Sequence, residues 1–202
     1  MVKIQKLTSI AIILMFMPLL SFAQEDKVKT VLTQYLSYLE QGRSLDSYKL
    51  LSSEDKELMT YEAFKQIVIA GQRMSHLSFF EVRSITFESD YLANAVVRMI
   101  TVDFYTLIAT GVIETMPSSI NPYQEGSSLA DFSQEFLESL PSSFPKNKAE
   151  TLAAIEQKKL PSVELDLPYK AIKEKNEWKV LLDLKQANEE MEAINRMLKE
   201  LE

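Results

Sequence analysis

Two side chains in this sequence stand out as capable of acid–base chemistry, His76 and Asp103. His76 is the only histidine in the chain. Because histidine titrates near neutral pH, a dyad of His76 with Asp103 would be suited to proton transfer. The alternative is a surface histidine between a helix and a strand. We favour this alternative because a lone histidine forms no motif, and we therefore predict no catalytic residue.

A second arrangement lies on a long strand predicted at residues 93–105. Strand alternation places four residues of mixed chemistry on one face: Met99, Thr101, Asp103 and Tyr105. A carboxylate and a phenol two residues apart could serve as base and hydrogen-bond donor. The alternative treats Asp103 and Arg98 as solvated positions near a sheet edge. We favour it, since faces of mixed polarity are common in antiparallel sheets.

The composition argues against several other kinds of site. With one histidine and no cysteine, a metal would need an all-oxygen site, and no loop shows the alternating acids of a calcium motif. No serine lies in a glycine-flanked nucleophile elbow, and four glycines provide no Gly-rich phosphate loop. The net charge of −7 argues against nucleic acid or an anionic membrane as a partner. We predict no metal and no cofactor.

The N-terminus has the pattern of a signal peptide. Lys3 and Lys6 precede a mostly apolar run over 7–20, and small residues then end at Ala23. The apolar run is shorter than the ~20 residues that a membrane span needs. We expect residues 1–23 to be cleaved, which leaves a soluble, periplasmic or secreted protein without a membrane span. The alternative is an uncleaved N-terminal anchor.

The spacing of apolar residues predicts helices in the first third of the remaining chain. A helix over 28–39 ends at Gly42, a second covers roughly 44–52, and a third begins near Thr60. Ser44 and Thr60 each stand two residues before an acid, so we expect their hydroxyls to cap the second and third helices.

Two hairpins follow, and they are separated by an insertion. Alternating residues predict strands at 82–87, 93–105, 161–171 and 178–184. The intervening residues, about 112–160, hold most of the prolines and two segments with helical spacing. These segments cover 129–140 and 146–159. Because a structureless loop of this length is unusual in a compact domain, we predict a helical insertion.

The chain ends in a predicted helix over 185–202 with a narrow apolar stripe. Spacings of four and three residues separate the stripe residues Ala187, Met191, Ile194, Leu198 and Leu201. An isolated helix of this length is marginal in water, so the stripe should be covered. Docking on the chain's own sheet or helices is favoured, because the stripe is short for a coiled coil. The alternative is a homodimer or capture of a partner protein, so we expect a monomer or a homodimer.

The order of elements indicates an α+β fold in which N-terminal helices pack on a curved antiparallel sheet, with residues 24–184 in one domain. The segments LDSYKLLSSEDKELMTYEAF and KNEWKVLLDL resemble exported bacterial members of the nuclear transport factor 2-like family, a cystatin-like α+β cone. Ser47 departs from this pattern, since relatives often carry alanine there. The insertion and the last helix also lie outside the resemblance.

The resemblance implies a broad range of functions, because this fold serves isomerases, dehydratases and polyketide cyclases as well as non-enzymatic binding domains. We expect an exported, soluble, non-enzymatic binding or interaction protein, whose ligand could be small and apolar. The alternative is a small-molecule isomerase or dehydratase that uses the cone-shaped pocket. Candidate pocket residues are Tyr35, Phe64, Met99, Asp103, Tyr169 and Trp178. The aromatic residues Tyr35, Tyr169 and Trp178 also fit core stripes, which is the favoured interpretation for them.

Overall fold

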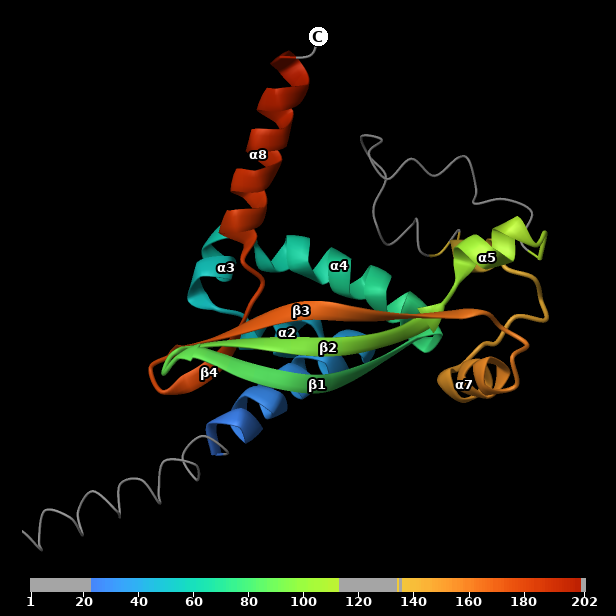
Figure 1. The fold of residues 1–202 in the computed structure, drawn as a ribbon, viewed down its shortest axis with the longest axis horizontal. Helices are drawn as coiled ribbons and strands as arrows, with labels where there is room; N and C mark the ends of the chain where they lie inside the picture. The colour runs from blue at the N-terminus through green and yellow to red at the C-terminus, as the bar shows by residue number, and fades with distance from the viewer. Residues whose placement is uncertain (1–22, 113–133, 135, 201–202) are drawn as a thin grey trace, which may run out of the picture.

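The computed structural model of the protein describes residues 23–112, 134 and 136–200 (Figure 1). An N-terminal helix over residues 23–40 comes first. It is followed by α2 (Ser44–Leu50), α3 (Ser53–Leu58), α4 (Tyr61–Met74), the 3-10 turn η1 (Ser75–Leu77), β1 (Ser78–Ser89), β2 (Leu92–Val102), α5 (Phe104–Ala109), α7 (Lys148–Glu156), β3 (Ser162–Glu174), β4 (Glu177–Leu181) and α8 (Leu184–Glu200).

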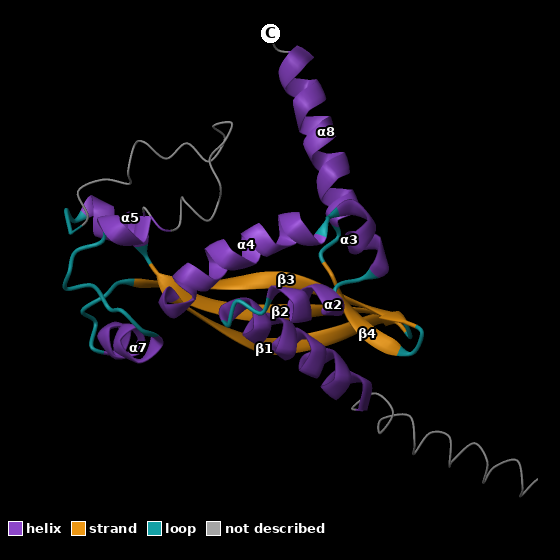
Figure 2. Ribbon diagram, turned by 180° about the vertical axis from the view of Figure 1, so that it is seen from behind, coloured by secondary structure: helices purple, strands orange, loops and turns teal. Residues whose placement is uncertain are grey.

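The four strands form one antiparallel sheet in the order β1-β2-β3-β4. The N-terminal helix, α2 and α4 lie on one side of this sheet (Figure 2). Bulges in β1 between Val82 and Ser84 and between Phe87 and Ser89 interrupt its register with β2 and bend the strand. This architecture confirms the predicted α+β fold class.

We call the sheet face under the helices the inner face, and the opposite face the outer face. The N-terminal helix buries the apolar stripe predicted for it, namely Val28, Val31, Leu32, Tyr35 and Leu36. In the same core, the inner face carries small residues on its central strands, Ala93, Ala95 and Ala171. Small side chains allow a helix to approach a sheet closely, which explains alanine at positions where β-branched residues would otherwise be favoured.

One of the two predicted helix caps is confirmed and the other is wrong. Thr60 Oγ1 accepts a hydrogen bond from the Ala63 amide at 3.3 Å, so Thr60 caps α4. The N-cap of α2 is Arg43, which makes no side-chain capping bond, and Ser44 instead bonds Tyr61 Oη at 3.0 Å. Ser44 is drawn into this contact because α2 and α4 pack together.

The sequence patterns missed α3, a six-residue helix that lies between the second and third predicted helices. Ser52 caps it by accepting a hydrogen bond from the Asp55 amide at 3.0 Å. The Ser52 amide in turn donates to Val180 O at 2.8 Å, which joins the α2–α3 link to the edge of β4. A helix this short offers too few turns for apolar periodicity to reveal it.

The strand predicted over 93–105 ends earlier, at Val102. Asp103 is the N-cap of α5, and its carboxylate accepts a hydrogen bond from the Thr106 amide at 3.1 Å. The helical insertion therefore begins at residue 103 and not near 112. The last strand is also shorter than predicted, because β4 ends at Leu181 and α8 begins at Leu184.

Helices between β2 and β3 are confirmed within the described part of the insertion. The helix predicted over 146–159 is α7. Half of the one predicted over 129–140 lies outside the described residues, and the described residues 134 and 136–139 are helical. Helices α5 and α7 lie at one end of the sheet (Figure 1). A second, small core joins the insertion to η1 and to the end of β2, and it consists of Leu77, Val102, Leu107, Phe144 and Leu160.

Helix α8 points away from the sheet and the other helices (Figure 1). Its residues 185–192 are exposed, and Met191 keeps 56% of its surface accessible. The favoured prediction, docking of the apolar stripe on the same chain, is therefore wrong for Ala187 and Met191. The side chains of the remaining stripe residues lie outside the described part of the structure, as does the predicted signal peptide up to residue 22.

Candidate functional site

A cavity of about 230 Å³ lies between the helices and the inner face, and we call it the interlayer cavity. The N-terminal helix, α4, η1, β1 and β3 contribute to its walls. Apolar side chains dominate the lining: Leu36, Leu39, Met74 and Phe80. The rest of the wall comes from Glu40, Gly71, Ser75, Ser78 and Tyr169. An apolar cavity with a few polar groups is the usual composition of a small-molecule site.

The C-terminal end of the N-terminal helix contributes three residues to the cavity wall. Leu36, Leu39 and Glu40 recur at helical spacing, so they share one face. The helix then ends at Gly42, which adopts a positive φ of 68°. A Cβ atom at Gly42 would lie 2.2 Å from Gln72 Oε1, so the close packing of this turn against α4 also requires glycine.

A second cavity of about 290 Å³, the adjoining cavity, shares Leu36, Glu40 and Phe80 with the first. Its other walls include Lys29 and Glu81, which carry opposite charges. Glu40 therefore lies at the boundary of both cavities. Its carboxylate is the charged group that the walls of the two cavities share.

Lys148 from the insertion is bound to this carboxylate. Lys148 Nζ lies 2.6 Å from Glu40 Oε1, and the same ammonium lies 5.4 Å from the centre of the Phe79 ring. The Glu40 side chain keeps 26% of its surface exposed, and that of Lys148 keeps 39%. The first residue of α7 is thereby held against the last turn of the N-terminal helix.

Two phenols lie on the inner side of the sheet near the cavity. Burial raises the pKa of Tyr35, and repulsion between its phenolate and the ionised forms of the nearby Tyr169 and Asp55 raises it further. Burial also raises the pKa of Tyr169. Both phenols are therefore neutral hydrogen-bonding groups at physiological pH, and Tyr169 presents such a group on the cavity wall.

The predicted pocket residues separate into three groups, of which the first lies at or near the cavity. Tyr169 lines the cavity itself. Met99 is half-buried on β2, where its Cα pairs with those of Phe80 and Leu165 in the two neighbouring strands. Since Phe80 is a wall residue, Met99 supports the cavity from the adjacent strand.

The second group belongs to the packed core. Tyr35, Phe64 and Trp178 keep only 4%, 2% and 6% of their surface exposed. The Phe64 ring packs 5.5 Å from the Tyr48 ring, and the Trp178 ring packs 5.8 Å from the Phe87 ring, between ring centroids. These three residues fill the space between the layers and line none of the cavities described here.

The third group is Asp103, which lies in the insertion. Thr106 Oγ1 donates to its carboxylate at 2.6 Å, and this bond lowers the pKa of Asp103. Tyr105, predicted to share its strand face, is 84% exposed in α5. His76 in η1 lines a separate surface hollow together with residues of the insertion. Within the described residues, Asp103 and His76 form no hydrogen bond or ion pair with each other.

Sequence reasoning missed most of the residues that form the cavity, including Leu39, Glu40, Met74 and Phe80. One signal was available for Glu40, which follows Leu36 by four residues on the buried face of the first helix. A carboxylate that continues an apolar stripe is unusual, because solvated acids normally occupy the opposite face.

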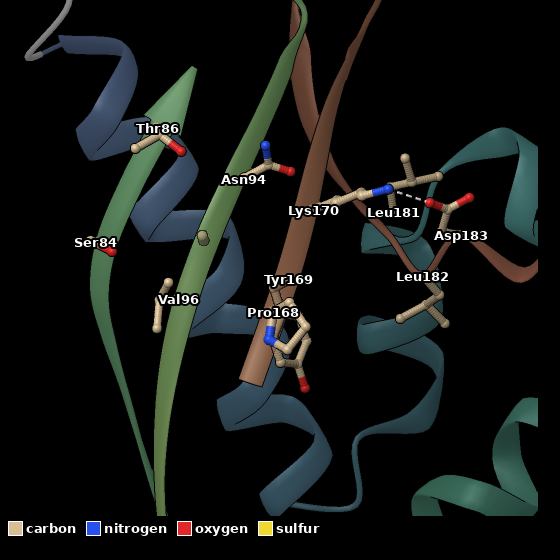
Figure 3. A pocket seen from close by; sticks show the side chains of 11 residues that line it. Ser84, Thr86, Asn94, Val96, Pro168, Tyr169, Lys170, Leu181, Leu182 and Asp183 are labelled. Atoms are coloured by element: carbon tan, nitrogen blue, oxygen red, sulfur yellow. Dashed lines mark hydrogen bonds and ion pairs between the residues drawn. The ribbon is translucent and has the colours of Figure 1, made fainter. Parts of the chain in front are cut away.

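A larger hollow of about 390 Å³, the outer-face groove, crosses the outer face (Figure 3). Lys170 points toward Asp183 there, and their Nζ and Oδ2 atoms lie 2.5 Å apart. Asn94 donates to Glu88 at 2.7 Å. These polar groups are already paired, and no helix among the described residues covers this face. We therefore regard the smaller interlayer cavity as the better ligand site.

Comparison of the chain with protein-family models, with curated proteins and with solved structures finds no match. Across the described residues, no group of three or more His, Cys, Asp or Glu side chains is arranged to hold a metal ion. No helix in the same part of the chain combines the length and apolar character that crossing a bilayer requires.

Proposed function

We propose that this protein is a non-enzymatic binding protein that takes a small, mainly apolar ligand into the interlayer cavity. The observation that carries the proposal is the composition of the wall, in which Leu36, Leu39, Met74 and Phe80 surround a few polar groups. The hydroxyl of Tyr169 is available to orient such a ligand.

The proposal includes export and a relation to the nuclear transport factor 2-like family. Helices packed on one face of a four-strand antiparallel sheet support the relation. The n-region, apolar run and small residues before Gln24 support export to the periplasm or the medium. N-terminal sequencing of exported protein tests this part, with Gln24 expected as the first residue and a retained Met1 contradicting it.

The alternative function, an isomerase or dehydratase, depended on Asp103 as the inward carboxylate. The structure places Asp103 at the start of α5, where Thr106 occupies both carboxylate oxygens. Asp103 is absent from the wall of the interlayer cavity. Ligand binding without turnover is the function that the wall of the cavity supports best.

The test uses a variant that fills the cavity without strain. Gly71 lies on the wall in α4, and a Cβ atom built there meets nothing within 4 Å. Gly71→Leu should occupy the cavity while preserving the fold, because leucine also has a higher helix propensity than glycine. Gln66→Leu, at an exposed position of the same helix, is the matched control.

The measurement is a titration of isotope-labelled protein with n-hexanol, followed by NMR chemical shifts. We expect shifts at Leu36, Leu39 and Phe80 in the wild type and in Gln66→Leu, and their loss in Gly71→Leu. A folded Gly71→Leu variant that binds n-hexanol as the wild type does would contradict the proposed site. A wild type that shows no shifts at the cavity would contradict it equally.

A further inference from the structure

We propose that the ligand carries an ammonium group and that Glu40 binds this group in the interlayer cavity. The inference rests on the proposed function and specifies its ligand class as a small apolar amine. Among the described wall residues of this cavity, Glu40 is the one with a charged side chain. Lys148, the partner of Glu40, is not part of the wall of either cavity.

The Glu40 carboxylate retains capacity for a second donor. Its Oε1 atom accepts Lys148 Nζ at 2.6 Å, and no described residue donates to its Oε2 atom. An ionised carboxylate has about four lone-pair sites. A ligand ammonium inside the cavity could therefore bind Glu40 either beside Lys148 or in its place.

Lys148 compensates the charge of Glu40 in the absence of a ligand. A carboxylate that lies against apolar side chains is costly unless a cation or hydrogen-bond donors balance it. Lys148 supplies that balance from the insertion, and its other contact, with the Phe79 ring, lies outside the cavity wall. A ligand ammonium would provide the same compensation while its apolar part contacts Leu36, Leu39 and Phe80.

The same geometry predicts the order of preference among head groups. An ammonium forms a charge-assisted hydrogen bond with Glu40. A neutral hydroxyl group can bond the hydroxyls of Ser75, Ser78 or Tyr169 without a change of charge. A carboxylate would be repelled by Glu40. We therefore expect ammonium to bind more tightly than alcohol, and alcohol more tightly than carboxylate.

The experiment compares three probes with the same alkyl chain at neutral pH, n-hexylammonium, n-hexanol and hexanoate, by NMR titration. We expect n-hexylammonium to bind about tenfold more tightly than n-hexanol, as one charge-assisted hydrogen bond provides. Glu40→Gln should remove this preference and keep n-hexanol binding, which also reports that the cavity is intact. Lys148→Met should strengthen n-hexylammonium binding by removing a competing cation.

The control is Glu62→Gln, which changes an exposed acid of α4 that is absent from the wall. This variant should keep the full order of preference. Equal binding of n-hexylammonium and n-hexanol by the wild type, or a preference that survives in Glu40→Gln, would overturn the inference and leave the proposed function standing. Failure of all three probes to bind at the cavity would overturn both.

Discussion

The inner and outer faces of the sheet contribute differently to the stability of this protein, although alternate residues of the same strands form them. On the inner face, Ala93, Val97 and Trp178 are buried beneath the helices. On the outer face, the half-buried Arg98 of β2 forms an ion pair with the exposed Glu164 of β3. Burial of apolar surface drives folding, whereas exposed ion pairs gain little because water solvates both charges. We infer that the inner face supplies most of the stability.

Charged side chains on the outer face form ion pairs with one another. Glu164 accepts Arg83 at Oε1 and Arg98 at Oε2, at 2.7 Å and 2.5 Å. In addition, a guanidinium nitrogen of Arg83 lies 3.7 Å from Asp166 Oδ1, and one of Arg98 lies 3.7 Å from Glu81 Oε2. Alternating residues predicted β3 from the sequence, and these ion pairs balance the charges on the exposed face of that strand. The comparison can be tested by changing one residue at a time on each face.

The largest effect is expected for Trp178→Ala on the inner face. Trp178 is 6% exposed and packs against Phe87, so its removal leaves a cavity in the core. We expect the free energy of unfolding to fall by ~3–5 kcal/mol in urea titrations. Lys179→Ala, the next residue on the outer side of β4, is the control and should change it far less. A loss below ~1 kcal/mol for Trp178→Ala would contradict this account of the inner face.

The second-largest loss of stability is expected for the buried carboxylate of Asp55, in contrast to the exposed carboxylate of Glu164. Asp55 is fully buried and accepts hydrogen bonds from Ser52 Oγ at 2.7 Å, the Leu182 amide at 2.7 Å and the Leu184 amide at 3.3 Å. These bonds attach α3 to the junction between β4 and α8. Asp55→Ala leaves the three donors without an acceptor, so we expect a loss of about 2–3 kcal/mol.

Hydrogen exchange provides the direct measurement for this variant. The amides of Leu182 and Leu184 should exchange faster in Asp55→Ala, because both lose their acceptor. Asp55→Asn retains one side-chain oxygen and should lose less stability than Asp55→Ala. Unchanged exchange at Leu182 and Leu184 would show that the junction does not depend on the carboxylate.

The part of this fold that sequence could predict is the part governed by repeating burial. The first helix alternates buried and exposed residues around Leu32 and Tyr35, and β4 alternates around Trp178 and Val180, so period alone reveals both. Asp103 shows where period fails. Its position continues the strand pattern, but its carboxylate stabilises the start of a helix, and this local competition ends the strand.

The candidate site was less predictable than the fold because its wall comes from segments far apart in the chain. Glu40, Met74, Phe80 and Tyr169 belong to four different elements, and only their packing brings them together. Of these four, sequence reasoning selected Tyr169. Aromatic residues such as Phe64 satisfied the same sequence criteria and proved to be core, because periodicity identifies the buried face of an element and does not show where packing leaves space.

The third effect concerns the loss of folding stability at alkaline pH that a residue buried against the inner face causes. The pKa of Tyr35 is raised above its ordinary value of 10.0, mainly by burial. A raised pKa in the folded state contributes stability that is complete below the unfolded pKa and is lost as pH rises above it. We expect Tyr35 to account for a loss of about 1–1.5 kcal/mol between about pH 8 and about pH 11. Tyr35→Phe should therefore lose less stability than the wild type over this interval in urea titrations, and an identical loss would contradict the assignment.

The smallest effect is expected for Glu164→Gln on the outer face, and it appears at the opposite end of the pH range. The hydrogen bond from Arg98 is the main cause that lowers the pKa of Glu164 below its ordinary value of 4.5. A lowered pKa in the folded state contributes stability that is present above the unfolded pKa and is lost as pH falls through the folded pKa. Glu164→Gln should thus leave the melting temperature at neutral pH almost unchanged, since the Glu164 carboxylate is exposed to solvent. Below about pH 4.5 the variant should lose stability slightly less steeply than the wild type. A large drop in melting temperature at neutral pH would show that the outer face contributes to the fold as the inner face does, and would remove the distinction between them.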